Sequence, residues 1–300
     1  MLPSIYLSHG SPMLAIDPGP TGAIFDALGA SLRAQRPRAV LVVSAHWIYS
    51  TLAVGTRERQ EAWHDFGGFP RELYALRYDA PGSPDLAARV KALVEAAHIP
   101  GAGFVGFDEE RPLDHGAWMP MRHFFPDADI PVVQLALNPY LAPAVQIEIG
   151  RALAPLRAEG VLVLASGSFT HNLQEVFGGG RRAQHGGETE PYVDAFRGWM
   201  LDALDEALAT GDTSRIADYR AQAPHARRAH PTDEHLLPFY VALGAALGPR
   251  EAGSAQAPAD VAPADVARVA DEVTYGVLAM DTFVFNGQGA GARPPERAAA

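Results

Sequence analysis

The amino-acid sequence predicts a single α/β domain whose central, mostly parallel sheet is flanked by helices. Three short apolar runs, at residues 2–7, 39–43 and 161–165, lack the alternation of apolar and polar residues that marks a half-exposed strand. They are therefore typical of strands buried on both faces, as in a parallel sheet. Segments with helical periodicity separate the runs, which implies right-handed crossovers between parallel strands. Each run is also followed by a histidine: His9, His46 and His171.

The other elements of the first half are predicted from periodicity and from residues that begin or end helices. Spaced Ile, Phe and Leu residues predict an amphipathic helix over 20–34, which ends before Pro37. Ser83 is the expected N-cap of a second helix, with Pro84 in its first turn. In chain order, the expected elements are strand 2–7, helix 20–34, strand 38–45, aromatic loop 63–70, helix 84–97, loop 101–118, strand 130–137, helix 143–159 and strand 160–165.

The second half of the sequence is expected to contain two long helices and a closing strand. The second of these helices has Thr232 as its expected N-cap and His235 in its first turn. The closing strand is expected at an edge of the sheet, and the domain to end near residue 286. In chain order, the expected segments are a glycine-rich loop 178–190, helix 191–209, helix 231–247, an Ala/Pro/Gly linker 248–265, strand 274–285 and a disordered tail 287–300.

Composition narrows the possible function classes. The formal net charge of −11 argues against a nucleic-acid binder, which needs basic residues to displace counterions from phosphates. The chain has no cysteine, so a metal site would have to be built from imidazole and carboxylate. The N-terminus lacks the basic region followed by an apolar region that is typical of a secretory signal. No apolar run is long enough to span a membrane. A cytoplasmic protein that acts on a small molecule is the expectation.

The positions of the histidines carry the functional prediction. His9, His46 and His171 each follow a predicted strand, and the carboxyl ends of parallel strands share one edge of a sheet, where ligands bind. We therefore expect these imidazoles to form a joint site, which His235 can join from its helix. Imidazole ligands suit iron, zinc and copper. For His115, substrate contact and a plain surface loop are equally compatible with the sequence, and His64 fits either a pocket wall or a structural aromatic cluster.

Six motifs occur together in a familiar order. They are Ser-His-Gly-Ser-Pro at 8–12, Ser-Ala-His-Trp at 44–47, His-Asp-Phe-Gly-Gly-Phe-Pro at 64–70, Leu-Asp-His-Gly at 113–116, Ser-Gly-Ser-Phe-Thr-His-Asn at 166–172 and Pro-Thr-Asp-Glu-His at 231–235. In this order the chain resembles the 4,5-DOPA dioxygenase extradiol family of the class III (LigB-type) extradiol ring-cleavage dioxygenases. The resemblance covers about residues 3–285, and its most specific motif is Ser-His-Gly-Ser-Pro.

The resemblance implies a LigB-type catalytic domain over 1–286 that opens a single-ring catechol, such as DOPA, beside its two hydroxyl groups with O₂. By motif, His9, His46 and His235 correspond to the metal ligands, with Glu234 as the rival of His235. His171 corresponds to a fourth ligand or to the acid/base, and His115 to a histidine that contacts substrate or oxygen. Fe(II) is the expected working metal, and Zn(II) is a possible bound ion. The predicted pocket wall comprises Trp47, His64, Phe69 and Trp118.

Two other functions fit the same residues. One is a zinc-dependent hydrolase in which the metal activates water and Glu234 or His171 is the base. The other is a binding protein that keeps the metal cage without turnover. The sequence predicts no nucleic-acid or membrane partner and no particular oligomeric state.

Overall fold

A computed structural model describes residues 1–178, 184–249 and 265–286 of the chain. The predicted tail at 287–300 lies outside the described residues, as do most of the linker at 248–265 and part of the glycine-rich loop at 178–190. Within the described part, no helix combines the length and the apolar composition needed to cross a bilayer.

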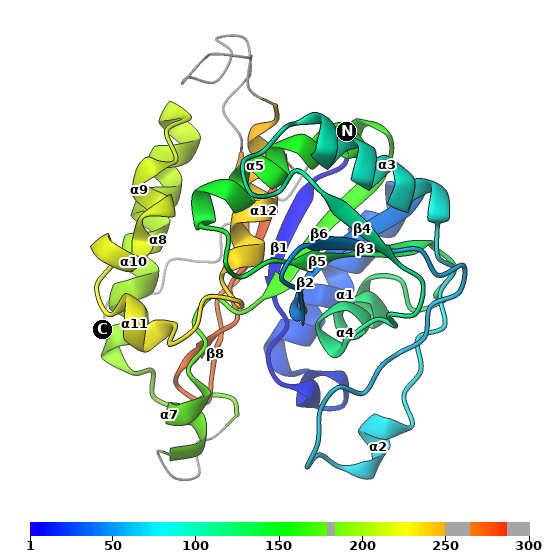
Figure 1. The fold of residues 1–300 in the computed structure, drawn as a ribbon. Coiled ribbons are helices and arrows are strands. Elements are labelled where there is room, and N and C mark those ends of the chain that lie inside the picture. The colour runs from blue at the N-terminus through cyan, green and yellow to red at the C-terminus, as the bar shows by residue number, and fades with distance from the viewer. Residues whose placement is uncertain (179–183, 250–264, 287–300) are drawn as a thin grey trace.

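The centre of the fold is a sheet with the strand order β4-β3-β5-β2-β6-β1-β10-β7 (Figure 1). The pairs β1–β6, β6–β2, β2–β5 and β3–β4 are parallel, whereas β3–β5, β1–β10 and β10–β7 are antiparallel. The mostly parallel α/β fold that the sequence predicts is therefore confirmed. The strands of this sheet are β1 (Ser4–Ser8), β2 (Ala39–Ile48), β3 (Leu52–Gly55), β4 (Val105–Asp108), β5 (Val132–Leu137), β6 (Val161–Gly167), β7 (Val266–Ala270) and β10 (Thr282–Phe285).

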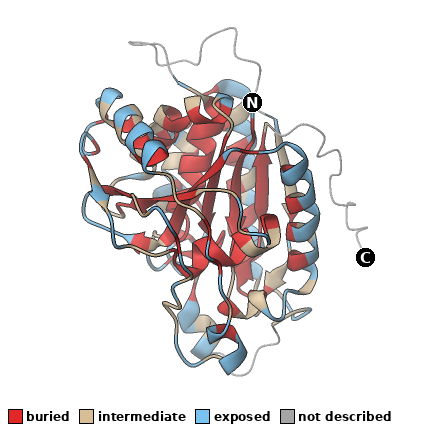
Figure 2. Cartoon of the chain, turned by 90° about the vertical axis from the view of Figure 1, so that its right-hand side faces the viewer, coloured by how far each residue is buried: buried red, intermediate tan, exposed pale blue. Residues whose placement is uncertain are grey.

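Helices cover both faces of this sheet, so the molecule has three layers. Alternate residues of β2 enter different cores: Leu41 and Val43 pack in one, and Val40 and Val42 in the other. The central strands are accordingly buried on both faces, and the helices expose only their outer surfaces (Figure 2). One face is covered by α3 (Pro84–Ala96), α5 (Pro143–Leu153), α8 (Pro191–Thr210) and α12 (Leu237–Leu247), and the other by α1 (Gly19–Ala34) and α4 (His115–Phe124).

Shorter elements connect these layers. They are η1 (Pro12–Ala15), α2 (Arg71–Tyr74), α6 (Pro155–Ala158), α7 (Leu173–Gly178), α9 (Ser214–Ala217), α10 (Tyr219–Gln222) and α11 (Ala226–Ala229), with a small hairpin of β8 (Val273–Thr274) and β9 (Leu278–Ala279). Ser83 caps α3 as expected, because its side chain accepts a hydrogen bond from the Leu86 N–H.

The structure corrects several sequence-based boundaries. The predicted loop at 101–118 contains β4 and the start of α4, and β3 lies between the predicted strand at 38–45 and the aromatic loop at 63–70, where no strand is predicted. The predicted closing strand is interrupted: its final part, β10, lies between β1 and β7 rather than at the edge. The helix expected over 143–159 is divided into α5 and α6, since the ring of Pro155 prevents a continuous helix.

The helix expected to begin at Pro231 begins at Leu237, and this correction affects the site. Thr232 is not its N-cap, since its hydroxyl donates instead to the Glu234 carboxylate, 2.9 Å away. The segment before α12 is thus a turn held by its own side chains. His235 is located in that turn and not in the first turn of the helix.

Candidate metal centre

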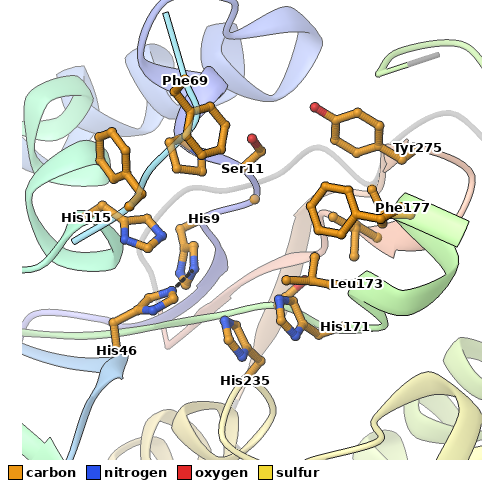
Figure 3. Close-up of a pocket in the computed structure, with 16 residues that line it drawn as sticks. His9, Ser11, His46, Phe69, His115, His171, Leu173, Phe177, His235 and Tyr275 are labelled. Carbon is orange, nitrogen blue, oxygen red and sulfur yellow. Dashed lines mark hydrogen bonds between the residues drawn. The ribbon is translucent and has the colours of Figure 1, made fainter. Parts of the chain in front are cut away.

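Five of the histidines singled out by the sequence come together at the carboxyl ends of the central strands (Figure 3). His9 directly follows β1, and His46 lies near the end of β2, beyond Ser44, where the ladder with β6 stops. His171 follows β6, and His235 comes from the turn before α12. His115 is the first residue of α4. All five side chains line one cavity.

His9, His46 and His235 form a group of possible metal ligands that consists of imidazoles alone. Each offers one ring nitrogen that lies within 4.8 Å of those of the other two, and Nε2 of His9 is 3.0 Å from Nε2 of His46. Two imidazole nitrogens that bind one ion at about 2.1 Å each, at roughly 90°, are about 3 Å apart. The spacing of this pair therefore fits two ligands of a common metal ion.

The hydrogen bond on the far nitrogen of His9 sets its tautomer. Ser166 donates its hydroxyl hydrogen to the Gly116 carbonyl, so its oxygen accepts from Nδ1–H of His9 at 2.9 Å. Nε2 of His9 is therefore left without a proton and can bind a metal through its lone pair.

His235 is oriented by the preceding residue. Its Nδ1 lies 3.1 Å from Glu234 Oε1, and a carboxylate can only accept, so Nδ1 carries the hydrogen. Nε2 of His235 is again the free nitrogen. The Glu234 carboxylate also accepts a hydrogen bond from the Thr232 hydroxyl. This second bond fixes the carboxylate, which in turn orients the His235 ring.

His171 lies beside this group rather than within it. Its ring is stacked on that of His235, with centroids 3.5 Å apart and planes 10° from parallel. Together with Glu234 and His235 it forms a second group of possible ligands. Burial lowers the pKa of His171 to about 4, so the ring is neutral at neutral pH and can accept a proton.

His9, His46 and His235 are also held neutral. Burial, followed by the neighbouring histidines, lowers the pKa of His9 and of His235 well below the ordinary value. Burial and then His115 lower the pKa of His46 to about 3. Because metal ligands must be deprotonated, the donor set is ready to bind a cation at neutral pH. Three neutral imidazoles without cysteine fit iron, zinc or copper.

Two glycines allow the histidine-bearing segments to approach this closely. A Cβ on Gly116 would lie 2.6 Å from Ser44 Oγ and 3.1 Å from both His9 and His46. A Cβ on Gly167 would lie 2.0 Å from the carbonyl oxygen of His235. Any side chain at either position would therefore separate the histidine-bearing segments.

His115 is placed by a buried cap at the start of α4. The Asp114 side chain accepts from the Ala117 N–H and, at 2.6 Å, from the hydroxyl of Ser44. Ser44 lies two residues before His46, so one carboxylate ties the start of α4 to the end of β2. The His115 and His46 rings are consequently 3.9 Å apart between centroids.

The cavity above the histidines has a volume of about 290 Å³ and a largely apolar wall. Phe66 and Phe69 come from the aromatic loop at 63–70, and their rings meet edge to face with centroids 5.4 Å apart. The rest of the apolar wall consists of Pro12, Leu173, Val176, Phe177, Tyr275 and Leu278. A cavity of this size suits a small ligand such as one substituted aromatic ring.

Only one of the four residues predicted for the pocket wall lines the cavity, namely Phe69. Trp47 is buried on the other side of β2 against Ala53 and Ala136, since successive side chains of a strand point to opposite faces. Trp118 is buried in the core beneath α4 and donates its ring N–H to the Trp63 carbonyl. His64 packs edge to face on Trp118 and bonds the Leu76 carbonyl, so it belongs to the structural aromatic cluster.

Sequence reasoning missed Ser166, Asp65 and the cavity residues of α7 and the β8–β9 hairpin. Ser166 and Asp65 stand inside two of the recognised motifs, but only the fold shows which histidine each one contacts. Phe177 and Tyr275 carry no local signal, because elements distant in the sequence bring them to the cavity.

Comparison with known proteins identifies the family of the chain. Residues 3–267 match the family model described as the catalytic LigB subunit of aromatic ring-opening dioxygenase. The chain is 39% identical over 246 residues to 4,5-DOPA dioxygenase extradiol of Beta vulgaris, covering 81% of this chain and 86% of that protein. It is 38% identical over 247 residues to the protein of that name from Escherichia coli, covering 81% and 85%.

A crystal structure described as the uncharacterized protein JW3007 from Escherichia coli K12 has the same fold. It superposes with a TM-score of 0.69 at 28% sequence identity, over 95% of this chain and 99% of that one. The family match spans most of the chain and includes all five clustered histidines. This chain therefore belongs to the LigB family of aromatic ring-opening dioxygenases.

Proposed function

We propose that this protein is a non-haem, Fe(II)-dependent extradiol dioxygenase that opens a single-ring, DOPA-like catechol beside its two hydroxyl groups with O₂. The observation that carries the proposal is the group of three neutral imidazoles at the base of an apolar cavity of about 290 Å³. The names of the relatives, 4,5-DOPA dioxygenase extradiol, support both the extradiol reaction and the substrate class.

In this proposal, His9, His46 and His235 hold the metal through their Nε2 atoms. Ser166 and Glu234 support this assignment because they occupy Nδ1 of His9 and of His235. Glu234 then orients a ligand and is not one itself. When bound, Fe(II) would supply the positive charge that acidifies the catechol hydroxyls and the redox chemistry that O₂ requires, which zinc does not provide.

We assign the proton transfers to His171. Its ring lines the cavity and is neutral, so it can take a proton from one catechol hydroxyl and return it as the ring opens. Its stacking on His235 keeps it beside the metal ligands. His115, on the opposite side of His9 and His46, contacts the bound substrate or oxygen in this proposal.

The cavity wall supports a flat aromatic substrate. Phe66 and Phe69 on one side and Leu278 on another exclude water from the ring, which strengthens polar interactions near the histidines. We propose that Phe69 helps to select among catechols and that residues 1–286 form the catalytic domain. The family match over residues 3–267 supports most of that extent, and the pairing of β10 with β1 supports the rest.

Oxygen uptake tests the proposal. The purified protein is stripped of metal, loaded anaerobically with Fe(II), and given DOPA, catechol or protocatechuate in air while absorbance is recorded. We expect O₂ consumption with a new visible-absorbing product. His46→Ala should lose the metal and the activity together, because it removes a ligand. His171→Gln should keep the metal and lower kcat by about 10²- to 10⁴-fold, because it removes an acid/base group.

Controls separate the alternatives. Loading with Zn(II) instead of Fe(II) should abolish O₂ uptake. Loss of metal in His171→Gln would make His171 a fourth ligand. Hydrolytic turnover of an ester or amide under anaerobic conditions, without O₂ uptake on any catechol, would support the zinc hydrolase and contradict the dioxygenase.

A further inference from the structure

Asp65 makes the closest polar contacts of any residue in the aromatic loop with the histidine cluster. Its Oδ1 lies 2.9 Å from the backbone nitrogen of His115 and 2.9 Å from Nδ1 of the same residue. The Asp65 side chain is 10% exposed and that of His115 is 7% exposed, so water competes little for these bonds. One carboxylate oxygen therefore holds both the main chain and the ring of His115.

These two bonds determine the tautomer of His115. A carboxylate only accepts hydrogen bonds, so Nδ1 must carry a hydrogen in order to contact Asp65. In the neutral ring, Nε2 then has a free lone pair. The ring lines the cavity and is directed toward His9 and His46 (Figure 3), so this lone pair is available where the substrate would bind.

The contacts of Asp65 distinguish it from a metal ligand. Asp65, His46 and His115 offer donor atoms within 4.8 Å of one another. Nε2 of His46, however, lies 3.0 Å from Nε2 of His9, and Asp65 Oδ1 already accepts from two N–H groups. The Asp65 carboxylate is thus hydrogen-bonded to His115 and is not part of the group formed by His9, His46 and His235.

Asp65 also joins His115 to the wall of the cavity. The next residue, Phe66, packs edge to face on the His115 ring, with centroids 5.6 Å apart, and meets Phe69 on its other side. The loop that contacts an aromatic substrate and the histidine that faces it are therefore connected through one residue. Displacement of the Asp65 carboxylate would therefore disturb both the aromatic loop and His115.

We propose that Asp65 is a positioning residue that holds His115 in the Nδ1–H tautomer and in line with the cavity, so that Nε2 can accept a hydrogen bond from the substrate. The participation of His115 in turnover rests on the proposed function. The tautomer itself does not, because it follows from the hydrogen bonds alone.

Nitrogen NMR of the histidine rings tests the tautomer directly. Two-bond ¹H–¹⁵N correlations are recorded on the ¹⁵N-labelled full chain loaded with diamagnetic Zn(II), and His115→Gln assigns the signals. We expect the Nδ1–H form in the unmodified protein. Asp65→Asn should retain it, because the backbone N–H of His115 keeps the amide oxygen facing both donors. Asp65→Ala should lose it, giving the Nε2–H form or a mixture.

Kinetics of the Fe(II)-loaded protein provide the second readout. Asp65→Ala should lower kcat by about 10- to 100-fold, the usual effect of removing a partner that orients a functional histidine, with little change in KM. Asp65→Asn should stay within about fivefold, because only the charge of the acceptor is lost. Asp26→Ala is the matched control: it removes another Asp–His pair, with His123, outside the cavity, and should leave kcat unchanged.

Several outcomes would overturn the proposal. These are an Nε2–H tautomer in the unmodified protein, an unchanged tautomer in Asp65→Ala, or loss of bound metal in that variant, which would make Asp65 a ligand. If Asp65→Ala does not fold, an Nε2–H tautomer in the unmodified protein or in Asp65→Asn would still overturn the proposal. Absence of turnover on every catechol would remove the proposed function and leave the NMR result standing.

Discussion

The imidazoles of the site differ in the partner that each has on its far nitrogen. His9 donates to the neutral hydroxyl of Ser166, whereas His235 and His115 donate to the carboxylates of Glu234 and Asp65. A carboxylate partner makes the other ring nitrogen more basic than a hydroxyl does. The hydrogen-bond acceptor of each ring thus makes the basicity of its free nitrogen differ from one histidine to the next.

Ser166 provides a test at this scale. Ser166→Ala removes the acceptor that fixes Nδ1–H of His9, so Zn(II) affinity should fall by about 10- to 100-fold. Competition with a chromophoric chelator measures this affinity. Ser168→Ala is the matched control, because its buried hydroxyl donates to the Thr170 carbonyl instead. Equal losses in the two variants would attribute the effect to packing and not to the tautomer of His9.

Among the elements, α12 is central because it is buried along its whole length. It packs closely on α5: a Cβ on Gly244 would lie 2.0 Å from the Ile147 carbonyl oxygen, and a Cβ on Gly150 would lie 2.1 Å from that of Val241. Each helix thus contributes one glycine to the contact, and each glycine lies against the backbone of the other helix. Since α12 follows the turn that carries His235, this contact also sets the position of a proposed ligand.

Substitution of a packed and of an exposed helical glycine should therefore change the free energy of unfolding in opposite directions. Gly244→Ala forces a methyl group against rigid backbone and should lower the free energy of unfolding by about 1–3 kcal/mol or more. Gly198→Ala lies on the exposed face of α8, where a Cβ meets no atom of the described residues within 4 Å, and should raise that free energy by about 0.5–1 kcal/mol. Urea denaturation of both variants measures the difference. A stable Gly244→Ala protein would contradict the close helix contact.

For the whole molecule, the buried histidines predict sensitivity to acid. His230 is fully buried outside the cavity; its Nε2–H donates to the Phe169 carbonyl, and its Nδ1 has no hydrogen-bond partner among the residues that the structure describes. Burial lowers its pKa to about 3, against 6.5 in the unfolded chain. Between these values the unfolded state binds a proton that the folded state does not. The contribution of His230 to stability is thus complete above about pH 6.5 and is lost as the pH falls toward 3.

This linkage is measurable in the metal-free chain. One such group contributes a slope of about 1.4 kcal/mol per pH unit to the free energy of unfolding. His230→Gln should reduce the slope between pH 4 and 6 by about that amount, as measured by urea denaturation at several pH values. His98→Asn is the control, because His98 is exposed and Asn tolerates its left-handed backbone. An unchanged slope in His230→Gln would show that His230 does not stay neutral in the folded state.

Some of the differences between expectation and structure had a signal in the sequence. The two-residue period of a strand separates Trp47 from His46, so both could not face the same cavity. Asp114 is an N-cap residue type directly before His115, which marks the start of α4. Other differences had none: the β4 strand is only four residues long, and its pairing with β3 depends on distant segments.

The sequence by itself determined the class of fold, the burial of the central strands and the meeting of His9, His46 and His171 at one edge. These follow from local patterns, because apolar runs form buried strands and parallel strands end on the same side. Only the tertiary structure decided the partners of the rings, the cavity wall and the turn that holds His235. Those depend on contacts between residues such as Ser166 and His9, or Asp65 and His115, that are 157 and 50 positions apart. Side-chain contacts over such separations are set by how layers pack, which no local pattern specifies.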